Sequence, residues 1–158
     1  MARINEANRG KVMAAVRGRD TRPELTLRRA MWRHGITGYR CHAQSLPGSP
    51  DIAFTRYRLA IFVDGAFWHG HPEFIRSNAT EYWRQKIARN IARDREVESR
   101  LTEMNWRTIR FWDFEVMGNC DSCLERIAAA IRETSGEQIA PVTQKWRDGP
   151  NAFRSVAG

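Results

Sequence analysis

Residues 58–71 read RLAIFVDGAFWHGH, and this stretch decides how the rest of the chain folds. It begins with an apolar run that ends in an aspartate and a glycine, a pattern typical of a buried strand followed by a turn. Two large aromatic residues, Phe67 and Trp68, then stand next to two histidines. Aromatic rings in a loop among titratable groups need a partner, which is either the protein core or a bound ligand.

The segments on both sides predict a mixed α/β fold. Residues 50–55 and 57–64 read as two strands that join through residues 56–57, a spacing typical of a β-hairpin. The other predicted elements are a helix over 21–34, a strand over 38–44, a helix over 80–105, a strand over 106–112 and a helix over 123–133. The order α-β-β-β-α-β-α predicts a mixed β-sheet flanked by helices. We expect one domain over residues 1–134 and a loosely held tail over 135–158.

Composition narrows the class of protein. The net charge is +8, and 23 of the 26 basic residues are arginines, whose planar guanidinium suits phosphate groups and stacks on bases. A genome that favours arginine codons would give the same ratio, so charge alone leaves a nucleic-acid partner open. Three cysteines do not indicate a disulfide framework, and no stretch approaches the roughly 18 apolar residues of a membrane helix. We therefore expect a cytoplasmic protein with no membrane contact.

Two aspartates mark the ends of the predicted hairpin. Asp51 begins the first strand and Asp64 ends the second, so antiparallel pairing brings both carboxylates to one edge of the sheet. Like charges at close range repel unless a cation lies between them, and an oxygen-only donor set suits Mg²⁺. His69 follows in the next loop, and its imidazole side chain, of the type most used for proton transfer, makes it a candidate general base. Each residue alone also has a structural interpretation, as a turn residue or as a loop histidine that bonds the backbone.

Two further acidic residues have both a structural and a catalytic interpretation. Thr21 and Glu24 have the spacing of a capping box at the start of the first helix, which by itself explains the glutamate. Asp94 lies on the apolar stripe of the long helix, where a buried carboxylate needs an arginine, a histidine or a metal ion as partner. We expect a structural or supporting role for Asp94.

Aromatic and basic residues are interleaved near the start of the long helix, from Trp83 to Asn90. If Phe67, Trp68 and Trp83 face one groove lined by arginines, their rings could stack on bases or wedge into a DNA helix. The alternative is that all three rings anchor the hydrophobic core. Composition does not decide between the two.

Five segments carry a family resemblance: GKVMAAVRGRDTRPELTLRRAM (10–31), SLPGSPD (45–51), AIFVDGAFWH (60–69), EYWRQKIARNIARDRE (81–96) and LTEMNWRTIRFWDFE (101–115). In this order and with similar gaps, over residues 8–118, they resemble the very-short-patch repair endonucleases. These are DNA nickases with a restriction-endonuclease-like fold. The resemblance is specific because it covers most of the predicted domain.

The resemblance implies a Mg²⁺-dependent active site. Asp51 matches the family's metal-binding aspartate, and Val63 stands where a main-chain carbonyl reaches the metal, although threonine is the usual residue there. His69 matches the general-base histidine, and Asp94 matches the aspartate that supports it. Glu24 matches a glutamate of the active site.

The resemblance also implies a set of DNA contacts. The matching positions are Phe67, Trp68 and Trp83 for rings that intercalate beside a T:G mismatch, and Met13, Lys86 and Asn90 for other contacts. The basic segment 1–20 is expected to contact DNA as well. The aromatic loop would then be a wedge, exposed because its partner is DNA.

Two departures set this chain apart from the family pattern. The family's structural zinc is bound by cysteines and a histidine, but Ala66, Glu73 and Phe114 stand at the cysteine positions and only His71 remains. One ligand does not make a tetrahedral site, so no structural zinc is expected. Asp64 replaces a histidine that the best-known members use beside the scissile phosphate, and an aspartate there could instead bind the metal.

The main hypothesis is a monomeric endonuclease that nicks one strand of double-stranded DNA at T:G mismatches. Mg²⁺ is its expected cofactor, the bacterial nucleoid its location, and mismatch-repair proteins are candidate partners. The substitution at Asp64 also supports a restriction-type or structure-selective nuclease of the same fold. A DNA-binding module without catalysis is a third interpretation, which the carboxylates argue against because they would repel phosphate.

Overall fold

The structure of the chain, a computed structural model, describes residues 18–73 and 80–136. Its elements are α2 (Arg22–Arg33), β1 (Arg40–Cys41), β2 (Ile52–Phe54), β3 (Leu59–Asp64), α3 (Glu81–Glu103), β4 (Arg107–Trp112), α4 (Asp113–Gly118) and α5 (Cys120–Ser135). The four described strands form one sheet in the order β1-β2-β3-β4, in which β4 runs parallel to β3 and the other neighbours are antiparallel. The predicted mixed α/β sheet is confirmed. None of the described helices is long and apolar enough to cross a bilayer.

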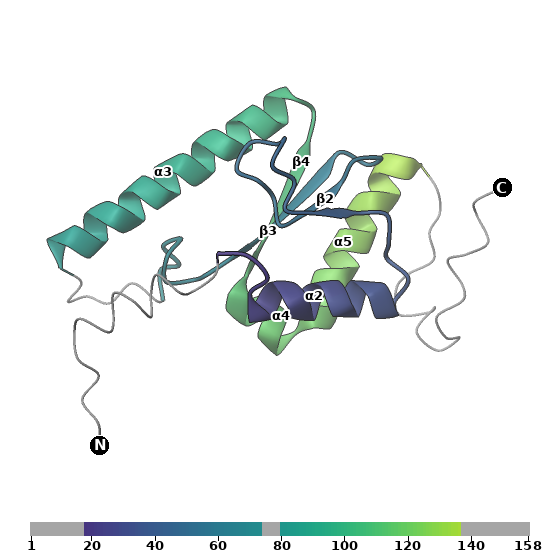
Figure 1. The fold of residues 1–158 in the computed structure, drawn as a ribbon, viewed down its shortest axis with the longest axis horizontal. Coiled ribbons are helices and arrows are strands. Elements are labelled where there is room, and N and C mark those ends of the chain that lie inside the picture. The colour runs from purple at the N-terminus through teal and green to yellow at the C-terminus, as the bar shows by residue number, and fades with distance from the viewer. Residues whose placement is uncertain (1–17, 74–79, 137–158) are drawn as a thin grey trace, which may run out of the picture.

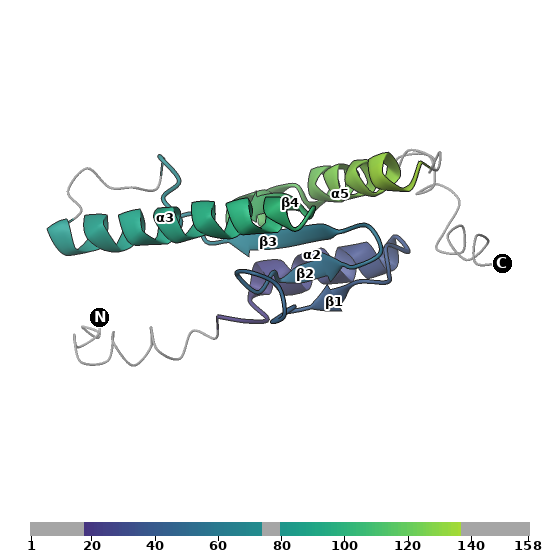
Figure 2. The same cartoon turned by 90° about the horizontal axis from the view of Figure 1, so that it is seen from above.

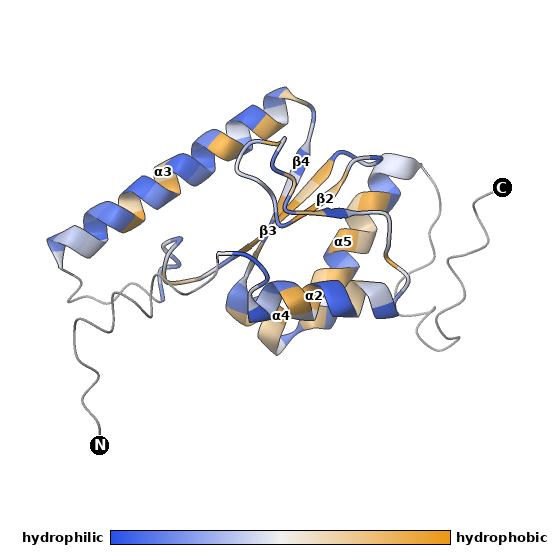
Figure 3. Cartoon of the chain, in the orientation of Figure 1, coloured by the Kyte–Doolittle hydropathy of each residue, from blue (hydrophilic) through white to orange (hydrophobic). Residues whose placement is uncertain are grey.

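Helices lie on both sides of the sheet (Figure 1). On one side, α2, α4 and α5 contact one another and enclose the main hydrophobic core. On the other side, α3 packs through a smaller apolar cluster. Figure 2 shows that α3 also extends well past the end of the strands, so its first turns lie beyond the sheet. Figure 3 shows the difference in composition: α3 is largely hydrophilic, whereas β2 is largely hydrophobic and α5 carries hydrophobic residues along part of its surface.

The alternation of side chains along β3 separates the two apolar clusters. Leu59 and Ile61 belong to the main core, whereas Ala60 and Phe62 belong to the cluster beneath α3. Asp64 continues the two-residue repeat of Phe62, so it lies on the α3 face of the sheet. The strand therefore changes from apolar to charged on this face at its last residue.

The neighbouring strands place charges on the same face. Arg110 of β4 pairs in register with Phe62, and its guanidinium carbon lies 4.4 Å from the centre of the phenylalanine ring. Ile52 and Phe54 of β2 enter the main core, which leaves Asp51, directly before the strand, on the opposite face. Charged side chains from three neighbouring positions thus gather where α3 covers the sheet.

The loop after β3 is held close against α3. Gly70 has a φ of +75°, and a Cβ at this position would lie 2.6 Å from Cδ1 of Ile91. Glycine is the residue that permits both this backbone conformation and this close approach. The side-chain amide of Asn90 donates a hydrogen bond of 3.0 Å to the main-chain carbonyl of Trp68. The aromatic loop and α3 therefore pack as one unit.

The first strand is shorter than predicted. It contains Arg40–Cys41 instead of residues 38–44. His42 has a φ of +49°, outside the extended region, and this ends the strand. The backbone N–H of His42 still donates to the carbonyl of Asp51 at 3.0 Å, which keeps the next turn beside β2.

The sequence did not predict α4, and it placed the start of the last helix at residue 123 instead of Cys120. α4 follows β4 without a loop. The carboxylate of Glu115 accepts a hydrogen bond of 2.8 Å from the backbone N–H of Trp112, and this contact caps the start of the helix. A six-residue helix that begins directly at a strand end shows no periodic signal of its own.

Candidate active site

One cleft on the α3 face of the sheet, with a volume of about 530 Å³, collects the residues predicted to act in catalysis. They come from α2, the β2–β3 hairpin, the aromatic loop and α3. The predicted residues that line the cleft are Glu24, Asp51, Val63, Asp64, His69 and Asp94. The fold therefore brings together every residue for which the sequence predicts a catalytic or metal-binding role.

Asp51 is fixed to the neighbouring strand by its side chain. Its Oδ2 accepts a hydrogen bond of 2.7 Å from the backbone N–H of Val63. Burial raises the pKa of the Asp51 carboxyl group to about 6, and the carboxylates of Glu24 and Asp64 add to this rise. The Val63 amide and His42 lower the pKa but are outweighed. The protein groups around Asp51 thus do not fully compensate the charge of its carboxylate.

His69 and Asp94 form a close pair across the cleft wall. Nδ1 of His69 lies 2.5 Å from Oδ2 of Asp94, and both side chains are about four-fifths buried. With the proton on Nδ1, the imidazole donates to Asp94 and leaves Nε2 as an acceptor. Nε2 lies 3.8 Å from Oδ1 of Asp64. The predicted contact between the base and a supporting aspartate is therefore present.

Asp64 has a partner that the sequence analysis did not single out. Arg110 donates from one terminal nitrogen to Oδ2 of Asp64 at 2.7 Å, and its other terminal nitrogen lies 3.8 Å from Oδ1 of Asp94. Only the two-residue repeat of β4 could have indicated that Arg110 faces the cleft. The role of Asp64 as a metal ligand stays a prediction. One of its two carboxylate oxygens already binds the guanidinium of Arg110.

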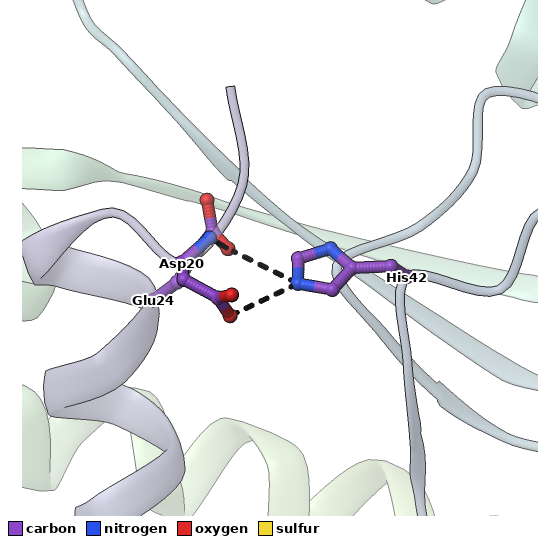
Figure 4. Close-up of side chains that lie close together, drawn as sticks. All are labelled: Asp20, Glu24 and His42. Atoms are coloured by element: carbon purple, nitrogen blue, oxygen red, sulfur yellow. Dashed lines mark hydrogen bonds and ion pairs between the residues drawn. The ribbon is translucent and has the colours of Figure 1, made fainter. Parts of the chain in front are cut away.

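Glu24 is buried and lines the cleft, in the group drawn in Figure 4. Its carboxylate accepts hydrogen bonds of 2.9 Å from the backbone N–H of Asp20 and from the hydroxyl of Thr21. Nε2 of His42 lies 3.1 Å from Oδ1 of Asp20 and 3.9 Å from Oε2 of Glu24. Among the described residues, this trio is the group of carboxylates and imidazoles whose ligand atoms all lie within 4.8 Å. Arg28 and then His42 hydrogen-bond to Asp20 and lower its pKa, so these contacts form an ion-pair network.

The three predicted DNA-contacting rings pack against one another. Ring centres are 5.0 Å apart for Phe67 and Trp68, 5.5 Å for Trp68 and Trp83, and 6.0 Å for Phe67 and Trp83. The Nζ atom of Lys86 lies 5.0 and 5.2 Å from the two indole rings. These rings are half-buried and lie outside both hydrophobic clusters. They are not anchors of either core cluster, and they are partly covered where the sequence predicted exposed rings; their role as a wedge in DNA stays a prediction.

The positions that match the family's zinc ligands are joined by other contacts. The ring of His71 packs edge-on against Trp112 and Phe114, with centres 5.0 and 5.1 Å apart. Ala66 is buried, and its backbone N–H donates to the carboxylate of Asp113 at 3.2 Å. Rings and a hydrogen bond therefore tie the aromatic loop to the start of α4. The expected absence of a structural zinc stays a prediction.

The sequence of this chain is similar to a known protein family and to several known proteins. The family model of the DNA mismatch endonuclease Vsr matches residues 1–73. The type II nicking enzyme V.NmeDIP of Neisseria meningitidis serogroup C is 40% identical over 141 residues, which cover 86% of this chain and 94% of that protein. The chain belongs to the Vsr DNA mismatch endonuclease family. The DNA mismatch endonuclease Vsr of Escherichia coli (strain K12) is 38% identical over 117 residues, or 72% of this chain and 74% of that protein.

Membership in the Vsr family confirms the resemblance seen in the sequence and makes this chain a DNA endonuclease. A further relative, the type II nicking enzyme V.HpaIIP of Haemophilus parainfluenzae, is 36% identical over 138 residues, which cover 84% of this chain and 97% of that protein. The roles of single residues in this Vsr family member stay predictions. Met13, most of the basic segment 1–20 and nearly all of the tail 135–158 lie outside the described residues.

The raised pKa of Asp51 predicts a stability gain when its charge is removed. Between pH 3.8 and about 6 the folded chain keeps a proton on Asp51 that the unfolded chain has lost. The free energy of unfolding therefore falls as the pH rises through this range, and the full loss is present above about pH 6. Asp51→Asn keeps an oxygen for the Val63 amide and removes the charge. In EDTA it should raise the free energy of unfolding by about 1–3 kcal/mol near neutral pH and change it little at about pH 4.

Urea unfolding at the two pH values measures this effect. Asp121→Asn, at an exposed aspartate in the first turn of α5, is the matched control and should give no gain at either pH. A loss of stability for Asp51→Asn at neutral pH would show that the carboxylate is fully compensated without metal.

Proposed function

We propose that this Vsr family member is a Mg²⁺-dependent endonuclease that nicks one strand of DNA at T:G mismatches in very-short-patch repair. The observation that carries this proposal is the meeting of Asp51 with the His69–Asp94 pair in one cleft. A carboxylate with a raised pKa and a histidine with a fixed ring are the two parts that phosphodiester hydrolysis needs. The family to which the chain belongs supports the choice of substrate.

The donor set of the cleft fits a divalent metal ion. Asp51 and the main-chain carbonyl of Val63 would hold it, because both residues line the same cleft and both groups are oxygen donors. The raised pKa of the Asp51 carboxyl group supports this assignment, since a bound cation would supply the counter-charge that the neighbouring protein groups do not. When bound, Mg²⁺ polarises the phosphate and stabilises the negative charge on the leaving oxygen.

His69 is the proposed general base. Asp94 holds the Nδ1 proton, so Nε2 is the nitrogen that takes a proton from the attacking water. The water oxygen forms a bond to phosphorus while the bond from phosphorus to the leaving oxygen breaks. One cleft with one such base cuts one strand, which is a nick.

The aromatic cluster is the proposed reader of the mismatch. Phe67 and Trp68 follow β3 by only a few residues, so a base step that contacts them lies near the cleft. Lys86 beside the rings supplies a positive charge for the DNA backbone, and the Asn90 hydrogen bond holds the main chain at Trp68. A mismatched step costs less to unstack than a paired one, so insertion of rings favours it.

A nicking assay tests this function. With Mg²⁺, the purified protein should nick one end-labelled strand of a duplex that carries a single T:G mismatch, and it should cut a matched T:A duplex at least about 100-fold more slowly. His69→Ala should lower the single-turnover rate by about 10²–10⁴-fold, the usual contribution of a general base. Asp51→Ala should remove cleavage and leave binding of the duplex in place.

The outcomes separate the hypotheses. Equal cutting of both duplexes would favour the restriction-type or structure-selective nuclease. If neither duplex is nicked while Asp51→Ala binds DNA like the wild type, the chain is a binding module without catalysis.

Loss of one ring should reduce mismatch preference. Trp68→Ala is expected to weaken binding of the T:G duplex by about 5- to 100-fold, the range for one lost stacking contact, and to change binding of the T:A duplex much less. Trp32→Ala is the matched control, because Trp32 is 70% exposed on α2 and lies outside the cluster. Fluorescence anisotropy with both duplexes measures the effect, and equal weakening for both would argue against a role of the ring in mismatch reading.

A further inference from the structure

Among the described residues, Arg110 is the arginine that pairs with both Asp64 and Asp94 beside His69, and it has no role in the proposed hydrolysis. It enters the cleft from β4 with about a quarter of its side chain exposed, stacked over the ring of Phe62. Its Nε atom is buried and has no hydrogen-bond partner among the described residues. An arginine held in this way has lost much of its hydration, so its contacts to carboxylates define its position.

Arg110 closes a ring of four charged or polar side chains. It binds Oδ2 of Asp64 at 2.7 Å and lies 3.8 Å from Oδ1 of Asp94. The other oxygen of each aspartate faces His69, at 2.5 Å from Nδ1 for Asp94 and at 3.8 Å from Nε2 for Asp64. Each carboxylate thus divides its two oxygens between the guanidinium and the imidazole.

The two aspartates have opposite effects on a general base. Asp94 supports His69, because it holds the proton on the nitrogen that does not react. Asp64 faces the reactive nitrogen, and a carboxylate that moved about 1 Å closer would bind a proton there and occupy the position of the water. Asp64 is 7% exposed, so solvent does little to hold it away from the imidazole.

We propose that Arg110 is a positioning residue that holds Asp64 away from Nε2 of His69 and anchors Asp94 on the opposite nitrogen. This rests on the proposed role of His69 as general base. Direct binding of the DNA phosphate by Arg110 is the rival interpretation. The structure disfavours it, because both terminal nitrogens face carboxylates and Nε is buried.

The proposal makes the effect of Arg110 depend on the charge of Asp64. Arg110→Met keeps an apolar stem over Phe62 and removes the charge, and it should lower the single-turnover nicking rate by about 30-fold with DNA affinity within about 3-fold of wild type. In an Asp64→Asn background the same change should cost only about 3-fold, because the charge of Asp64 is gone and only the longer 3.8 Å contact of Arg110 with Asp94 remains to be lost. Arg110→Lys, which keeps a cation near Asp64, should restore most of the rate lost in Arg110→Met.

Arg107→Met is the matched control. Arg107 lies on the same strand, but its half-exposed side chain pairs with Glu133 outside the cleft, so no change in rate is expected. Thermal unfolding of every variant shows whether it is folded. If Arg110→Met does not fold, two other variants still test the dependence on the charge of Asp64. They are Arg110→Lys and the double variant Arg110→Met with Asp64→Asn.

Three results would overturn the proposal. If Arg110→Met lowers the nicking rate by the same factor in the Asp64→Asn background as in the wild-type background, Arg110 acts without Asp64. A loss confined to DNA affinity would assign Arg110 to phosphate binding. If Asp64→Asn alone abolishes cleavage as Asp51→Ala does, Asp64 is a metal ligand and not a group that must be held back. Absence of nicking by the wild-type protein would instead remove the proposed function, so the two failures are distinguishable.

Discussion

The two-residue repeat of neighbouring strands places the charged groups of the cleft. In β3 the repeat directs Leu59 and Ile61 into the main core, and it directs Phe62 and Asp64 toward α3. A shift of one residue in the register would exchange these faces and bury Asp64 among apolar side chains. The same repeat in β4 sets Arg110 beside Phe62. The apolar pattern that stabilises the sheet therefore also decides which groups can meet at its end.

The gathering of acidic groups opposes folding and favours function. The raised pKa of Asp51 means that burial disfavours the charged form of its carboxyl group. Other carboxylates of the cleft have partners, since Arg110 binds Asp64 and His69 binds Asp94. The unbalanced charge is thus concentrated at the residue to which we assign the metal. An arrangement of this kind trades some stability for affinity toward a cation, as active sites often do.

Sequence reasoning predicted the hairpin, the long helix and the meeting of Asp51 and Asp64, because apolar runs and antiparallel pairing fix which strand ends meet. The catalytic places of Glu24 and Asp94 followed only from the family resemblance. It could not predict the bond between Asp64 and Arg110. Their contact depends on how the α3 crossover sets the parallel register of β3 and β4, which periodicity does not reveal. It also missed α4, which is too short for a helical pattern, and the partial burial of Trp68, which depends on packing against Trp83.

The position of the divalent ion is the most direct measure of whether this cleft is the active site. Fe²⁺ in place of Mg²⁺, with ascorbate and peroxide, generates radicals that cut the protein backbone beside the bound ion. Cuts are expected next to Asp51 and Val63 in the wild-type chain, and they should be absent from Asp51→Asn. Cuts confined to other segments, or the same cuts in both proteins, would contradict a metal centre between the hairpin and α3.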